Sequence, residues 1–78
     1  MSDAVHNPKH YRRGGLECKD VMRAMLDGML CPSIVAYWWA TALKYLWRWP
    51  AKNGVQDLEK CRECLDELIK EAKAAGMR

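Results

Sequence analysis

The stretch SIVAYWWATALKYLWRW, residues 33–49, decides the fold. Pro32 and Ser33 are typical of a first helical turn, because proline loses no hydrogen bond there and serine can cap free amide groups. Pro50 ends a helix, because it lacks an amide donor and its ring clashes with the preceding turn. The stretch is apolar nearly all round, which is typical of a helix at the centre of a bundle or an oligomer. It predicts a central helix over residues 33–49.

Two further helices are predicted on either side of this central helix, over residues 16–28 and 54–75. In the first, apolar side chains recur at helical spacing and Gly28 offers a stop signal. In the second, apolar side chains recur every three or four positions, Asn53 and Gln56 resemble a capping box, and Gly76 follows the end. The predicted fold class is all-α, with a three-helix domain over residues 16–78.

Residues 1–15 are predicted to form a basic loop arm in front of this domain. They hold two glycines, a proline, two histidines and three basic residues, without sustained periodicity. Residues 50–78 instead balance six positive with six negative charges. A net charge of +3 is too small for the strongly basic face of a duplex-binding protein, so nucleic acid is not favoured as a partner. A small phosphate-bearing ligand suits the basic arm better.

The amount of apolar surface predicts a helical homo-oligomer. Half of the 78 residues are hydrophobic and four are tryptophan, whereas a chain this short buries only roughly 60% of the surface that its unfolded form exposes. The tryptophans span more than half the circumference of the central helix, so at least one should meet a partner or a ligand. Subunit packing and stacking on a nucleotide base are both open explanations.

The chain shows no secretion signal, so a protein with reduced thiols that is not secreted is expected. The longest apolar stretch, Ile34 to Leu43, is too short for a bilayer that needs about 20 apolar residues. Cys61 and Cys64 have the C-x-x-C spacing of zinc and redox sites, but they fall in mid-helix. They are interpreted as structural cysteines, with zinc binding as the alternative.

A polar stripe marks one face of the apolar central helix. Its members are spaced by four, three and four residues and share that face: Tyr37, Thr41, Lys44 and Arg48. Two cations one turn apart in apolar surroundings need an anion, and a phosphate is well matched to arginine geometry. Glu17 or Asp20 could supply that anion instead. A phosphate site and an internal ion pair are therefore both open.

A second candidate ligand site lies in the predicted arm. His10 belongs to the loop Asn7–Tyr11, and paired glycines follow at residues 14 and 15. Glycine lets the backbone approach a ligand closely, and the free amides of the helix N-terminus that follows favour anions. The arm therefore predicts a contribution to anion binding.

Four separated motifs resemble, in order, those of the SaV-like family of small bacteriophage proteins. They are NPKHY at residues 7–11, GGLECKDV at 14–21, LKYLWRW at 43–49 and KNGVQDLEKC at 52–61. The family usually has histidine where this chain has Asn7. The resemblance implies phage origin and an association with nucleotides, since members are commonly described as nucleotide kinase-like. The residues on the family pattern are His10, Tyr11, Gly15, Glu17, Asp20, Lys44, Tyr45, Trp47, Arg48, Lys52 and Asn53.

The resulting hypothesis is a phage-encoded protein that binds a nucleotide in pockets between subunits and sequesters a host signal in the bacterial cytoplasm. The expected ligand-binding residues are His10, Tyr11, Arg12, Gly15, Lys44, Trp47, Arg48, Lys52 and Asn53. One alternative is a nucleotide kinase or phosphohydrolase in which Glu17 and Asp20 hold magnesium. The other is an adaptor that binds a host protein through the central helix.

Overall fold

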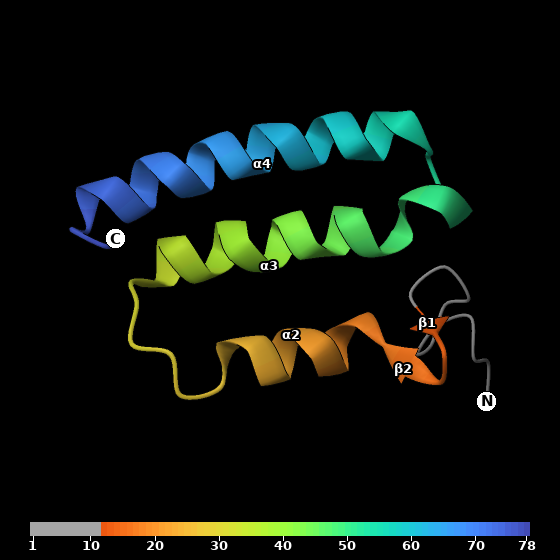
Figure 1. Ribbon diagram of the computed structural model, residues 1–78, viewed down its shortest axis with the longest axis horizontal. Helices are drawn as coiled ribbons and strands as arrows, with labels where there is room; N and C mark the ends of the chain where they lie inside the picture. The colour runs from red at the N-terminus through yellow and green to blue at the C-terminus, as the bar shows by residue number, and fades with distance from the viewer. Residues whose placement is uncertain (1–11) are drawn as a thin grey trace.

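A computed structural model describes residues 12–78 of the chain (Figure 1). Most of these residues lie in three α-helices, which confirms the predicted all-α class. The helices follow a short hairpin and are interrupted by one 3₁₀ turn. The elements are β1 (Arg12–Arg13), β2 (Leu16–Glu17), α2 (Cys18–Leu26), α3 (Ser33–Arg48), η2 (Trp49–Ala51) and α4 (Val55–Ala74).

The central position of α3 organises the molecule. Figure 1 shows α3 between α2 and α4, and the most extensive contacts of the described residues are those of α3 with α4. The contacts of α2 with α3 are fewer, and those between α2 and α4 are marginal. The three helices therefore form an open arrangement rather than a closed bundle, and much of the surface of α3 and α4 stays accessible.

The hairpin corrects the prediction that residues 1–15 are all loop. Arg12 pairs with Glu17 and Arg13 with Leu16 in an antiparallel register. Gly14 and Gly15, with φ of +55° and +81°, make the two-residue turn, which requires positive φ at both positions. Because Leu16 belongs to this hairpin, the first helix begins at Cys18 rather than at residue 16. Residues 1–11 of the predicted arm lie outside the described residues.

The connection between α3 and α4 also differs from the prediction in detail. The α-helix ends at Arg48, because Trp49–Ala51 continue as a 3₁₀ turn around Pro50. The residue that precedes α4 is Gly54, with φ of +61° and ψ of −137°, a conformation essentially restricted to glycine. The predicted capping box does not form, since no side chain caps α4 and Asn53 hydrogen-bonds elsewhere.

The core lies between α3 and α4 and is small. Ala42 of α3 packs with Cys61 and Cys64 of α4, flanked by the half-buried rings of Trp38 and Tyr45. The Cys61 thiol donates a hydrogen bond to the Ala42 carbonyl at 3.4 Å. Burial raises the pKa of both thiols, so these cysteines stay neutral and pack as small apolar side chains, as predicted. None of the four tryptophans is buried.

Candidate functional site

Arg48 and Asp57 form a buried ion pair where α3 gives way to α4. Their side chains retain only 8% and 0% of their accessible surface. Arg48 Nε donates to Asp57 Oδ2 at 3.2 Å and Nη2 donates to Oδ1 at 3.4 Å, a fork arrangement that guanidinium geometry favours. Asn53 Nδ2 donates to the same Oδ1 at 3.2 Å. These bonds tie the end of α3 to the first turn of α4.

The charge of Arg48 is therefore neutralised inside the protein. Burial by itself would raise the pKa of Asp57, but the hydrogen bonds from Arg48 and Asn53 and the charge of Arg48 outweigh it and hold that pKa below its usual range. The sequence left a phosphate site and an internal ion pair open for Arg48, and the structure shows the internal ion pair. Its anion, however, is Asp57 rather than Glu17 or Asp20.

The ring of Tyr45 stands among three cations. Lys44 Nζ lies 4.5 Å, Arg48 Cζ 5.0 Å and Lys60 Nζ 5.9 Å from its centroid. Within residues 14–78, neither lysine has a carboxylate within ion-pair distance. Asp57 neutralises the charge of Arg48, which leaves Lys44 and Lys60 as the two cations beside the ring without an ion pair in the described chain.

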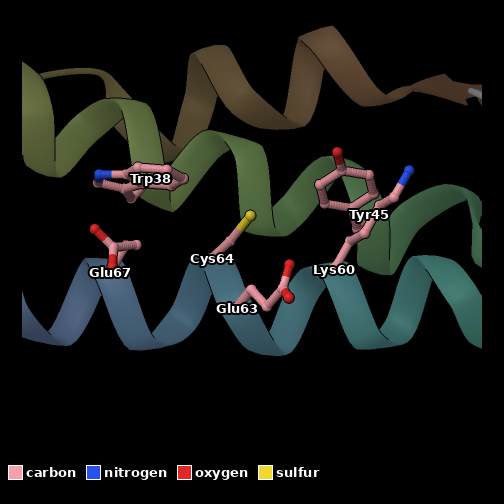
Figure 2. Close-up of a pocket in the computed structure, with 6 residues that line it drawn as sticks. All are labelled: Trp38, Tyr45, Lys60, Glu63, Cys64 and Glu67. Atoms are coloured by element: carbon pink, nitrogen blue, oxygen red, sulfur yellow. The ribbon is translucent and has the colours of Figure 1, made fainter.

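An open groove between α3 and α4 begins at this ring (Figure 2). It encloses about 380 Å³, within the usual size of small-molecule sites, and its lining residues are Trp38, Tyr45, Lys60, Glu63, Cys64 and Glu67. Trp38 and Tyr45 are seven positions apart, so they lie about 10 Å apart along the helix axis. Figure 2 shows Lys60 beside Tyr45 at one end and Glu67 directed toward Trp38 at the other. The groove therefore has Lys60 beside Tyr45 at one end, Glu67 beside Trp38 at the other, and the carboxylate of Glu63 between them, next to Lys60.

The rings at the two ends are held in place differently. The Trp38 ring meets the Tyr37 ring edge to face, with centroids 4.9 Å apart and an interplanar angle of 77°. The Tyr45 ring packs against the core and has Lys44 and Arg48 within cation–π distance of its centroid. Thr41, a member of the predicted polar stripe, turns back and donates a hydrogen bond to the Tyr37 carbonyl. It is therefore not part of the groove lining.

The other predicted ligand residues are spread over the molecule. His10 and Tyr11 lie outside the described residues, as does the side chain of Arg12 in β1. Gly15 forms the hairpin turn and Trp47 is half-buried near the end of α3. Lys52 is exposed after η2, and Asn53 is committed to Asp57. The structure thus brings together Lys44, Arg48 and Asn53 from the predicted set.

The two carboxylates proposed for magnesium lie where β2 meets α2. Glu17 Oε2 is 3.4 Å from Lys19 Nζ, and Asp20 is exposed one turn further on. In the part of the chain that the structure describes, no cluster of three or more potential metal-ligating side chains occurs. Glu17 and Asp20 supply two carboxylates without a third protein ligand beside them there.

Sequence reasoning missed the residues that α4 contributes. Asp57, Lys60, Glu63 and Glu67 fall between the apolar positions that recur along the last predicted helix, as exposed polar side chains ordinarily do. Their roles depend on the antiparallel register of two helices, which no local pattern specifies. The spacing of four residues between Asn53 and Asp57 is no such signal either, because Asn53 lies before α4 begins at Val55.

The groove, the buried ion pair and the open helix arrangement define a small three-helix protein with a ligand-sized cleft between its second and third helices. Residues 5–66 match the DUF3310 family, described as a protein of unknown function, so the chain belongs to that family. Comparisons with curated proteins and with solved structures found no match. In the described part of the chain, no helix has the length and apolar character needed to cross a membrane.

Proposed function

We propose that this protein binds a small phosphate-bearing nucleotide in the groove between α3 and α4. The observation that carries the proposal is the pair Lys44 and Lys60, which flank the Tyr45 ring without a carboxylate partner in the described chain. Half-buried lysine side chains without a counter-charge favour an anionic ligand, because their positive charges attract it. A phosphate group accepts several hydrogen bonds from such donors.

The other end of the groove suits a nucleobase. The half-buried ring of Trp38 offers a stacking surface, and base stacking on an aromatic side chain contributes roughly 1–3 kcal/mol. The distance of about 10 Å between Trp38 and Tyr45 along the helix matches the span from base to phosphate in a nucleotide. The Glu67 carboxylate, directed toward Trp38, can accept a hydrogen bond from an amino group on the base.

This proposal revises the expected ligand set. Lys44 remains a ligand, Lys60, Trp38 and Glu67 join it, and Arg48 becomes a positioning residue that fixes Tyr45 beside the groove. A binder without turnover would sequester its nucleotide. On the resemblance to SaV-like phage proteins, we place that activity in the cytoplasm of an infected bacterium.

Titration calorimetry tests the proposal directly. The intact protein is titrated with nucleoside mono- and diphosphates, cyclic nucleotides and inorganic phosphate. Lys44→Ala and Lys60→Ala are each expected to weaken nucleotide binding about tenfold or more, the scale of one charge-assisted hydrogen bond. Lys73→Ala, an exposed lysine in the last turn of α4, is the matched control and should leave binding unchanged.

Two results would refute the binding proposal. One is the absence of heat with every nucleotide, and the other is binding that survives both Lys44→Ala and Lys60→Ala. Nucleotide turnover followed in the same samples with added magnesium addresses the catalytic alternative. Phosphate release that depends on Glu17 and Asp20 would favour an enzyme over a binder.

A further inference from the structure

A second surface of the same helix pair is apolar and partly exposed. On α4, Leu58, Leu65 and Ile69 are spaced by seven and four residues, and Leu65 and Ile69 keep 41% and 52% of their surface exposed. At about 100° per residue, these three side chains lie on the side of α4 roughly opposite to Lys60, Glu63 and Glu67. They therefore face away from the groove.

The central helix continues this surface. Trp39, Leu43 and Leu46 of α3 are spaced by four and three residues, and Leu46 is 51% exposed. They lie on the other side of the α3–α4 contact from Trp38 and Tyr45, which line the groove. We call these six residues, Trp39, Leu43, Leu46, Leu58, Leu65 and Ile69, the apolar face. Leu46, Leu65 and Ile69 are exposed and the other three are half-buried, and a contiguous apolar surface of this kind is typical of an interaction site.

The edge of the apolar face carries one positive and one negative side chain. Arg62 and Asp66 are exposed, stand four residues apart on α4, and border the stripe formed by Leu65 and Ile69. Neither makes an ion pair with another residue of the described chain. A surface that carries both charges at its edge can be complementary to itself.

We infer that a second copy of this chain covers the apolar face, with the two α4 helices antiparallel across a two-fold axis level with residue 64. In this arrangement Arg62 lies beside Asp66 of the partner subunit, and the reciprocal pair forms by symmetry. A two-fold interface uses the same patch on both subunits, which is what these two charges require. The opposite face, with the nucleotide groove, stays open.

The register of α3 against α4 is compatible with the same axis. The pair Arg48–Asp57 sets residue 64 of α4 level with residue 41 of antiparallel α3, and the contact of Ala42 with Cys61 sets it level with residue 39. Residues 39 and 43 lie within about one helical turn of that level. The axis that pairs the α4 charges therefore also brings Trp39 near Leu43 of the partner subunit, large apolar side chains against each other.

The helix pair has room for an interface of moderate size. The apolar face spans residues 39–46 and 58–69, about 11 and 17 Å along their helices, and packed helices lie about 10 Å apart. The apolar face thus covers roughly 300 Å² in projection and the complete helices roughly 500 Å², against the ~800 Å² of accessible surface that each partner contributes to a standard interface. The core is small and contains no tryptophan. Association would therefore bury apolar surface that the single chain leaves accessible.

A charge-swap experiment followed by sedimentation tests this arrangement. The wild-type protein should sediment at twice the 9.0 kDa mass of one chain. Arg62→Asp and Asp66→Arg should each weaken dimerisation about tenfold or more, because each places like charges together at two symmetric positions. The double variant should dimerise again with nearly wild-type affinity. Lys70→Glu, an equal charge change at an exposed site on α4, should have little effect.

Each outcome separates the alternatives. Restoration in the double variant supports the antiparallel interface even if the single variants lose helical structure on dilution, because folding then follows association. A monomeric wild type, single variants that dimerise normally, or a double variant that stays weak would overturn the inference. None of these results depends on nucleotide binding, since the groove lies on the other side of the helix pair.

Discussion

Lys44 and Arg48 stand one turn apart on the same helix and beside the same tyrosine ring, yet their surroundings differ in one respect. Arg48 has its counter-charge inside the protein, in Asp57, and is almost fully buried. Lys44 contacts Tyr45 without a carboxylate partner in the described chain. The comparison teaches that a cation neutralised within the fold supports structure, whereas one left without a counter-charge is available for a ligand.

The largest expected effect on stability comes from removing Arg48, the cation that Asp57 neutralises. Arg48→Ala leaves the buried carboxylate of Asp57 without its charge partner, which should lower the free energy of unfolding by about 3–5 kcal/mol. Urea denaturation followed by tryptophan fluorescence measures this. The double variant Arg48→Met/Asp57→Leu should recover most of the loss, since no buried charge remains. Equal losses in the single and double variants would contradict a buried ion pair.

The next effect concerns the turn that aims Asp57 at Arg48. Gly54→Ala forces a side chain into a conformation that is essentially restricted to glycine, at a cost of about 1–3 kcal/mol in the free energy of unfolding. Thermal unfolding measures it, with Val55→Ala at the exposed first position of α4 as the control. An unchanged melting temperature would show that this turn does not constrain the ion pair.

Acid should weaken the ion pair between Arg48 and Asp57 and so lower the free energy of unfolding. Because the pKa of Asp57 is lowered in the folded protein, its contribution to stability is complete above the ordinary aspartate value of about 3.9 and is lost as the pH falls toward the folded pKa. Denaturation at a series of pH values from neutral to acidic therefore shows a decline below that value. The decline should be smaller in Asp57→Asn than in the wild type. An identical decline in the two proteins would contradict a lowered pKa for Asp57.

The smallest effect on stability is expected at Lys44 and Lys60, the two cations beside Tyr45 that have no ion pair in the described chain. Lys44→Ala and Lys60→Ala should change the free energy of unfolding by less than about 0.5 kcal/mol, as is usual for half-exposed side chains without an ion pair. Urea denaturation of these two variants and of Arg48→Ala under the same conditions compares their free energies of unfolding. A loss as large as that of Arg48→Ala would mean that the lysines also support the fold.

The elements of the fold were predictable because their signals are local. Pro32, Ser33 and Pro50 mark the ends of α3, and the predicted helix bounds agree with the structure to within two residues at each end. The hairpin was missed because two-residue strands carry no periodic pattern, although the glycine pair at residues 14 and 15 is a hairpin-turn signal.

The candidate site was predictable only in part, for a physical reason. The stripe containing Lys44 and Arg48 follows from helical spacing within one segment. The partner Asp57 and the ligand residue Lys60 meet that stripe through a tertiary contact across a turn, and several helix registers would fit the same apolar pattern. The buried hydrogen bonds of Arg48 distinguish the observed register from the others.

The central claim is that the two cations left without a counter-charge in the described chain, Lys44 and Lys60, mark a ligand site. The most direct test is an NMR titration of the ¹⁵N-labelled protein with the nucleotide that binds tightest in calorimetry. We expect the largest amide and indole shifts at Trp38, Tyr45, Lys60 and Glu67, and their loss in Lys60→Ala. Shifts confined to residues 12–17, or no shifts on α3 and α4, would contradict the account.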